Sequence, residues 1–366
     1  MSVTTMPPGE DVLVRLEGVV KHFPLARAGL RGEREVVHAL DGVSLEVRRG
    51  ETLGIVGESG SGKSTLARCM MRLQEPTAGT VLFEGTDITS LSQSALRPLR
   101  RQMQMIFQDP FGALNPRRRV GSIIGDPLAI HTKHSAAERK HRVQELMELV
   151  GLNPEHYNRF PAEFSGGQRQ RIGVARALAL HPKLIVCDEP VSALDVSIQA
   201  QILNLLVELQ EELHLTYVFI AHDLSVVRHV SDRVEVMYLG EIVERSPTSE
   251  LYRAPRHPYS AALLSAAPVP DPDYSDRRTH IVLTGDLPSP IRPPAGCRFS
   301  SRCPRRQPVC SAVAPVLEAC DGDSPEHAVA CHFPLGRDES PGRVADQGLG
   351  AGVATARGGA ATRSSW

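Results

Sequence analysis

The stretch GESGSGKST, residues 57–65, matches the pattern G-x-x-x-x-G-K-[ST] in full. It follows an apolar run at 52–56 and opens a segment with helical apolar spacing at 63–73. Glycine-rich backbone at such a turn presents N–H groups to phosphate oxygens, and the helix start adds partial positive charge. We expect Lys63 to reach the outer phosphates and the Ser64 hydroxyl to bind Mg²⁺. The predicted phosphate-binding residues are Gly57, Glu58, Ser59, Gly60, Ser61, Gly62, Lys63, Ser64 and Thr65.

Two acids follow a second apolar run, LIVCDEP at 184–190. Asp188, at the end of a predicted buried strand, is suited to hold Mg²⁺ directly or through water. Glu189 is placed to orient and deprotonate an attacking water. An acid pair at a strand end is often merely solvated. Together with a phosphate loop, it predicts hydrolysis of a nucleoside triphosphate.

The cysteines form a third chemical pattern. Four are spaced C297-x5-C303-x6-C310-x20-C331, and Cys320 lies between the last two. The N-terminal MSVTTMPPGEDV lacks a basic region and an apolar core, so we expect no secretion and few disulfides. Four thiolates in a Pro-rich segment with little apolar content can supply a metal staple. Iron–sulfur, zinc and unligated thiols remain open, although zinc ribbons prefer C-x2-4-C pairs. We expect Cys69 and Cys187 to be core residues.

Bulk composition narrows the class of protein. The 366 residues suggest two domains with a tail. The 41 Lys and Arg balance the 42 Asp and Glu, so charge does not favour nucleic acid as a partner. No apolar run reaches the roughly 18 residues that a spanning helix needs.

Segments with the apolar pattern of strands alternate along the chain with segments that have the apolar spacing of helices. This alternation predicts an α/β fold with a largely parallel sheet. Residues 24–37 are predicted to be a loop. The predicted strands are 12–23, two within 43–57, 80–84, 103–107, 183–190 and 216–223, and the predicted helices are 63–73, 135–151, 166–180 and 197–213.

FSGGQRQR, residues 164–171, resembles the signature of the ATP-binding-cassette (ABC) ATPases, with Phe where Leu is more usual. Ser165 is a good N-cap, which leaves N–H groups free at Gly166 and Gly167. The resemblance implies that this helix start, with Ser165, Gly166, Gly167 and Gln168, faces the γ-phosphate of ATP bound by a partner subunit.

Other residues match further motifs of that family. Gln108 in IFQDP resembles the glutamine that senses Mg²⁺ and water and touches a membrane subunit. Asp195 in SALD resembles a dimer-interface aspartate, and His222 in IAHD resembles the histidine that steadies the γ-phosphate. Phe23 in KHFP is expected to stack on adenine.

The resemblance implies a P-loop ABC ATPase nucleotide-binding domain. Its parts would be a RecA-like core, an antiparallel β subdomain and an α-helical signature subdomain, followed by a small Cys-containing C-terminal extension. The expected boundaries are a disordered N-terminus at 1–10, the ATPase domain at 11–255, the extension at 256–336 and a disordered tail at 337–366.

Residues 103–124 and 256–270 resemble the ATP-binding subunits of bacterial dipeptide and oligopeptide permeases. This implies Mg²⁺ and ATP as cofactors and a place on the cytoplasmic face of the membrane. The implied partners are a paralogous second ATP-binding subunit in a head-to-tail dimer, two transmembrane permease subunits and an extracytoplasmic peptide-binding protein. Nickel or glutathione import by a related subunit is the alternative.

A soluble, non-transport ABC ATPase acting on ribosomes or DNA is disfavoured, because the chain has one phosphate loop and no basic arm. A cassette that binds ATP without turnover is disfavoured by Glu189 and His222. The permease extension carries the same four-cysteine layout, and some members hold a [4Fe–4S] cluster there. The resemblance thus assigns Cys297, Cys303, Cys310 and Cys331 as ligands and leaves out Cys320.

Overall fold

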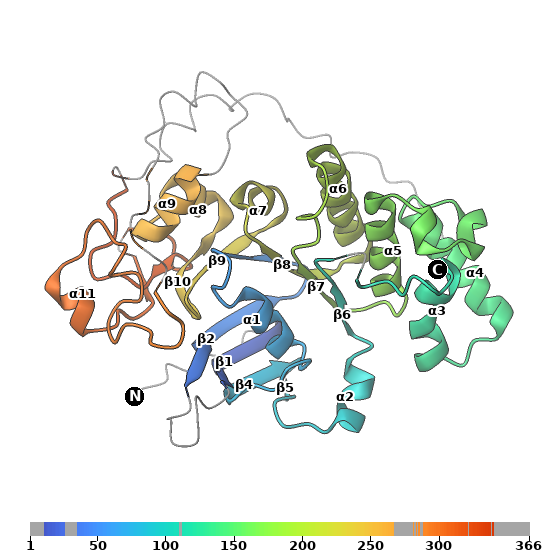
Figure 1. Ribbon diagram of the computed structural model, residues 1–366, viewed down its shortest axis with the longest axis horizontal. Helices are drawn as coiled ribbons and strands as arrows, with labels where there is room; N and C mark the ends of the chain where they lie inside the picture. Colours follow the sequence, from blue (N-terminus) through green and yellow to red (C-terminus); the bar gives the residue numbers. More distant parts are fainter. Residues whose placement is uncertain are drawn as a thin grey trace.

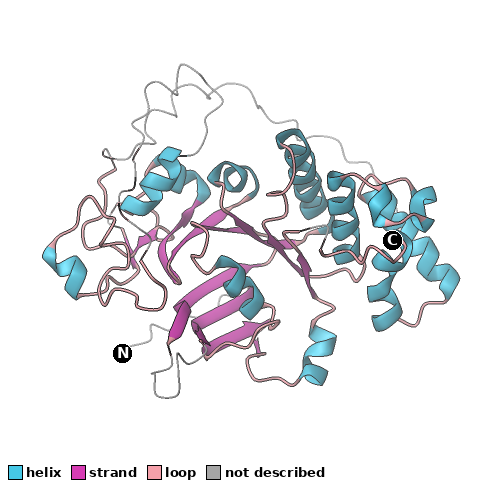
Figure 2. Ribbon diagram, viewed as in Figure 1, coloured by secondary structure: helices cyan, strands magenta, loops and turns pink. Residues whose placement is uncertain are grey.

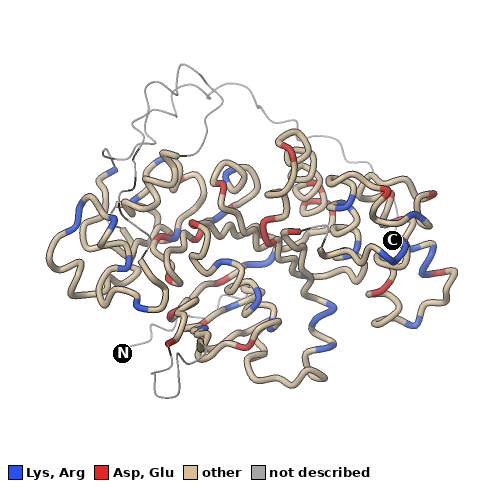
Figure 3. Tube along the Cα trace, in the orientation of Figure 1, with Lys and Arg blue, Asp and Glu red and all other residues tan. Residues whose placement is uncertain are grey.

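The computed structural model describes residues 11–25, 35–109, 112–266, 281, 283, 285, 288–320, 322–337 and 339. The predicted N-terminal segment 1–10 and all but two residues of the predicted tail lie outside this part of the chain. The described strands form a four-stranded sheet and an eight-stranded sheet, with helices around the larger one (Figures 1 and 2). Basic and acidic residues are interspersed along the described trace (Figure 3).

The smaller sheet is antiparallel, with the order β2-β1-β4-β5. Leu16 of β1 lies opposite Leu45 of β2 on one side and Val81 of β4 on the other. All three side chains are buried, so this face of the sheet is part of the core. The strands are β1 (Val12–Pro24), β2 (Val36–Arg48), β4 (Ala78–Phe83) and β5 (Thr86–Asp87).

The larger sheet has the order β11-β12-β10-β9-β3-β8-β7-β6, with parallel pairing from β9 through β6. The prediction of a largely parallel sheet is confirmed. Its strands are β3 (Thr52–Val56), β6 (Met103–Ile106), β7 (Leu184–Asp188), β8 (Thr216–Ala221), β9 (Arg233–Tyr238), β10 (Glu241–Pro247), β11 (Glu318–Ala319) and β12 (Ala328–Val329).

The central strands β3, β7 and β8 are buried on both faces. Their side chains alternate between two cores, as strand geometry requires. Val186 and Ile220 pack with α1 (Lys63–Met70) and the antiparallel sheet, whereas Ile185 and Phe219 pack with helices on the other face. Those helices include α5 (Gly166–Leu178), α6 (Val196–Leu213) and α7 (Leu224–Val230). The carboxyl ends of β7 and β8 therefore meet beside the start of α1.

A helical region lies beyond β6 at one end of the molecule (Figure 1). It contains α3 (Val120–His131), α4 (Ala136–Leu149) and α5. Helix α4 lies within the predicted helix 135–151, and a capping box of Ser135 with Glu138 begins it. Helix α3 was not predicted, because Gly121, Gly125 and Pro127 lower its helical propensity and burial compensates for them. Helix α2 (Gln93–Leu99) precedes β6.

The C-terminal region lies at the other end of the molecule, beside β10 (Figure 1). It is not a separate appendage, because β12 pairs with β10 and extends the main sheet. The region contains α9 (Pro258–Ala266) and α11 (Pro308–Ala312), and it follows α8 (Thr248–Arg253). No helix in the described ranges is both long and apolar enough to span a bilayer.

Candidate active site

The phosphate loop connects β3 to α1 and lies against neighbouring backbone. A Cβ atom at Gly57 would lie 2.2 Å from the Met237 carbonyl oxygen, and one at Gly62 would lie 2.4 Å from that of Ala39. Gly62 also has a φ of 106° at the N-cap of α1. Only glycine fits these two positions, since any other residue would push the loop away from β2 and β9. The Gly240 N–H donates to the Ser61 carbonyl across 2.8 Å and fixes the other side of the loop.

Lys63 is buried inside this loop and is 5% exposed. Its Nζ donates to the carbonyl oxygens of Gly57 at 2.7 Å and Glu58 at 3.0 Å. Burial lowers the pKa of Lys63, while the nearby carboxylates of Glu189, Asp188 and Glu58 oppose that shift. The loop thus holds a cation where a phosphate group would lie.

Ser64 and Asp188 form a pair of oxygen ligands. The Ser64 Oγ donates to Asp188 Oδ1 across 2.9 Å. Burial raises the pKa of Asp188, and the bond from Ser64 and the charges of Arg68 and Lys63 lower it. Hydroxyl and carboxylate oxygens are the protein ligands that Mg²⁺ takes beside phosphates.

Glu189 follows β7 directly and is held by two other side chains. Gln108 Nε2 lies 2.8 Å from Glu189 Oε2, and His222 Nδ1 lies 3.3 Å from the same oxygen. Glu189 adopts a left-handed backbone conformation with φ 46°, which is uncommon and costly outside glycine. Its N–H donates to Ile220 O at 3.0 Å and so ties the turn to β8. A carboxylate on a rigid turn is thereby aimed at the pocket.

Lys63, Ser64, Gln108, Glu189 and His222 line one cavity of about 630 Å³. Asp188 is not among its lining residues, but it is bonded to Ser64, which is. That size lies in the range of small-ligand sites. The lining residues are Val37, His38, Ala39, Ser59, Gly60, Gly62, Lys63, Ser64, Thr65, Gln108, Glu189, His222 and Pro290.

Some predicted residues do not line this cavity. Phe23, expected to stack on adenine, lies opposite Val37 across the β1–β2 pair, and the cavity wall is formed by Val37 and His38 instead. The sequence missed His38 because only strand pairing brings β2 to the phosphate loop. Residues 24–37 were predicted to be a loop, but β2 already begins at Val36.

The signature residues also lie outside the cavity. Ser165 caps α5 through a capping box with Gln168, and both are exposed. Gly166 is half-buried and Gly167 is buried. Asp195 is exposed at the N-cap of α6, beside Val196, which is 81% exposed. Their action on a partner's nucleotide stays a prediction.

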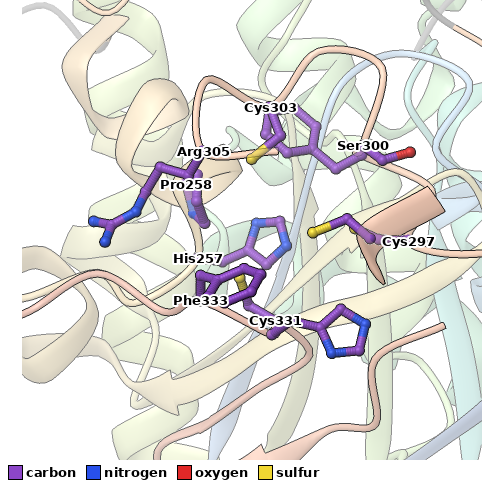
Figure 4. Close-up of a pocket in the computed structure, with 11 residues that line it drawn as sticks. His257, Pro258, Cys297, Ser300, Cys303, Arg305, Cys331 and Phe333 are labelled. Atoms are coloured by element: carbon purple, nitrogen blue, oxygen red, sulfur yellow. The ribbon is translucent and has the colours of Figure 1, made fainter. Parts of the chain in front are cut away.

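The cysteines come together in the C-terminal region. Cys297, Cys303, Cys310 and Cys331 line one pocket with His257, and Cys320 does not. The sulfur atoms of Cys297, Cys303 and Cys331 point into the same space (Figure 4). Burial raises the pKa of these three thiols, and that of Cys331 reaches about 12. Cys69 and Cys187 are fully buried in the core, as predicted.

The spacing of these sulfur atoms bears on which metal fits. Thiolates bound to one tetrahedral zinc lie roughly 3.8 Å apart, because each Zn–S bond is about 2.3 Å. Among the described residues, no three of the thiols lie mutually within 4.8 Å. His22, His38 and Asp41 do meet that distance, but the Arg298 guanidinium is already paired with Asp41. A mononuclear zinc site would need these thiols to lie closer together than they do here.

Fold and cavity together define an ABC ATPase, and comparisons with known proteins agree. Residues 40–192 match the ABC transporter family, and residues 243–310 match the family described as the oligopeptide/dipeptide transporter, C-terminal region. The chain is 33% identical to the dimeric post-hydrolysis cassette MJ0796 bound to ADP and Pi, with a TM-score of 0.57 over 64% of this chain and 99% of that one.

Three curated relatives span almost the whole chain. The oligopeptide transport ATP-binding protein AppF of Bacillus subtilis is 55% identical over 88% of this chain and 98% of its own length. The Escherichia coli dipeptide transport protein DppF is 49% identical over 91% and 98%, and the E. coli oligopeptide transport protein OppF is 51% identical over 88% and 96%. The chain belongs to the family of ABC-transporter ATP-binding proteins that carry this oligopeptide/dipeptide C-terminal region. It is an ATPase.

Proposed function

We propose that this ATPase drives the import of dipeptides or oligopeptides through a bacterial ABC importer. The observation that carries the proposal is that one chain contains both a nucleotide cavity and a peptide-transporter C-terminal region. A cavity with Lys63, Ser64, Gln108, Glu189 and His222 on its wall is joined to the C-terminal region typical of oligopeptide and dipeptide transporters. The relatives named above are themselves peptide transport proteins, which supports the cargo class.

In the proposed mechanism, residues 57–65 bind the phosphates of ATP and Lys63 neutralises the charge that develops on them. Ser64 and Asp188 would hold Mg²⁺, which would neutralise negative charge on the phosphates. Gln108 holds Glu189 and senses the water, and Glu189 accepts the proton of that water as it attacks. His222 steadies the γ-phosphate. Phe23 remains the proposed adenine contact, although His38 and not Phe23 lines the cavity.

We propose that the site is completed by a second chain. Ser165, Gly166, Gly167, Gln168 and Asp195 would face the nucleotide of a partner subunit in a head-to-tail dimer. Ser165, Gln168 and Asp195 are exposed, and none of the five residues lines this chain's own cavity, which supports that role. Membrane permease subunits are implied by the family. A paralogous second cassette subunit, two permease subunits, an extracytoplasmic peptide-binding protein and a place on the cytoplasmic face of the membrane are proposed. We also propose that nucleic acid is not among its partners.

We also propose the division of the chain at 255 and 256, between the ATPase domain and the extension. The start of α9 at Pro258 and the family match from 243 to 310 support a boundary in this region. The proposed start of the ATPase domain is residue 11, where the described part of the chain begins, and the proposed end of the extension is residue 336.

For the cysteine pocket we propose a [4Fe–4S] cluster bound by Cys297, Cys303, Cys310 and Cys331. The gathering of these four thiols around one pocket supports it, since each thiolate would bind a different iron atom. Backbone N–H groups of Phe299, Arg305 and Phe333 also bond to the thiols of Cys297, Cys303 and Cys331. Such bonds stabilise thiolate ligands and tune a cluster's potential. The cluster would act as a structural staple.

Cellular uptake tests the proposed cargo. A strain that lacks the gene receives the native chain or Glu189→Gln and is offered labelled dipeptide, a longer peptide and Ni²⁺. Peptide uptake restored only by the native chain is the expected result. Restored Ni²⁺ uptake without a peptide effect would move the protein to nickel import, and no change for any cargo would contradict an importer role.

A further inference from the structure

Glu58, the second residue of the phosphate loop, is held at two points by the C-terminal region. Its backbone N–H donates to the Tyr259 hydroxyl across 2.8 Å. Its carboxylate accepts two bonds from Arg302, at 2.8 Å from Nη1 and 3.2 Å from Nη2. These partners lie 201 and 244 residues further along the chain. A forked contact of this kind fixes direction as well as distance.

The two holding groups are rigidly supported. Tyr259 is fully buried, and its ring packs against Tyr238 and Phe299 at centroid distances of 4.7 and 5.4 Å. The Arg302 side chain is only 10% exposed, and Glu58 is 29% exposed. This burial sets the contact apart from an ordinary surface ion pair, which contributes little.

The same segment holds the neighbouring turn. Arg298 donates to the Leu239 carbonyl and pairs with Asp41 and Glu241. The next residue, Gly240, donates its backbone N–H to the Ser61 carbonyl of the phosphate loop. Residues 298–302 lie between the first two cysteines of the pocket, and Phe299 also lines that pocket. The loop between two cysteines thus holds the phosphate loop directly and through its supporting turn.

We propose that Arg302 is a positioning residue of the nucleotide site, which neutralises Glu58 and fixes the phosphate loop for ATP. The inference rests on the proposed role of residues 57–65 in binding ATP. Glu58 brings a negative charge next to Ser59 and Gly60, which line the cavity. The triphosphate is itself strongly anionic, so a free carboxylate at this point would repel it. Arg302 removes that repulsion without contacting the nucleotide.

Nucleotide binding to the purified full chain tests the proposal, with a fluorescent ATP analogue and Mg²⁺ and with Mg-ADP as competitor. Arg302→Met is expected to weaken binding about tenfold, because a partly buried charge-assisted contact is lost. The loss should shrink at high salt, since screening reduces the repulsion. Arg302→Lys, which keeps the charge but not the fork, should bind with intermediate affinity.

The double variant Glu58→Gln/Arg302→Met separates the effect of an unpaired Glu58 charge from the effect of losing the Arg302 side chain. It should regain most of the affinity lost in Arg302→Met, because neither charge remains. Arg305→Met is the matched control: it removes a nearby arginine that pairs with Glu339 at the surface. Native affinity in Arg302→Met, or a double variant no better than Arg302→Met, would overturn the proposal. Lys63→Ala with undiminished binding would instead reject the ATP-binding role of residues 57–65.

Discussion

Gln108 and Glu189 lie 81 residues apart, and the Gln108 side-chain amide donates to the Glu189 carboxylate across 2.8 Å. The bond joins the segment after β6 to the turn after β7, so movement of residue 108 is transmitted to the proposed general base. His222 reaches the same oxygen from the end of β8. Three neighbouring strand ends therefore determine where one carboxylate points.

Glu189→Gln should lower the ATPase rate by at least about a hundredfold in the assembled transporter, since an amide cannot accept the proton of the attacking water. ATP binding should persist, and the dimer should remain in the ATP-bound form. Single-turnover hydrolysis together with nucleotide retention measures both effects. An assembled Glu189→Gln transporter with near-native turnover would rule out this residue as the base.

Cys303→Ser should remove the proposed cluster. The expected result, for protein purified without oxygen, is loss of bound iron and of the brown visible absorption. Cys320→Ser is the matched control, because that thiol lies outside the pocket and should leave iron content unchanged. Iron-free, colourless native protein would contradict the cluster, and stoichiometric zinc would replace it with a mononuclear site.

The sequence predicted the parts of the fold that local patterns encode. The strand predicted at 183–190 and found at Leu184–Asp188, the helix after Ser135 and the glycine loop all have short-range signals. It did not predict α3, whose glycines and proline depend on burial, or β12, whose two residues are stabilised by pairing with β10. His38 and Arg302 were missed for the same reason. Each reaches the nucleotide site through contacts between segments far apart in the chain, which periodicity does not record.

Ser165→Ala should lower the stability of the protein and its ATPase rate together. Loss of an N-cap costs about 1 kcal/mol. Ser135→Ala is a close control, because Ser135 caps α4 with the same type of capping box and lies away from the cavity. Both variants should show similar shifts in denaturant unfolding, but only Ser165→Ala should reduce ATP turnover in the assembled dimer. Equal turnover in the two variants would limit Ser165 to a capping role.

Glu244 is the buried centre of the junction between the main sheet and the C-terminal region. Its carboxylate is fully buried and accepts bonds from the Arg256 N–H at 2.7 Å and the His257 N–H at 3.0 Å. It also lies 2.7 Å from Nε2 of His327, which is 1% exposed. The three donors come from two segments that the sequence separates by about seventy residues, and one carboxylate satisfies them all.

Glu244→Ala should therefore lower the free energy of unfolding by about 3 to 5 kcal/mol, because it leaves three buried donors without their acceptor. Glu250→Ala is the control, since that carboxylate is more exposed and lies 3.6 Å from His327. Its loss should cost less than about 1 kcal/mol. Urea unfolding of the full chain, followed by the fluorescence of its tyrosines, compares the two. Equal midpoints for both variants would show that the junction does not depend on the buried carboxylate.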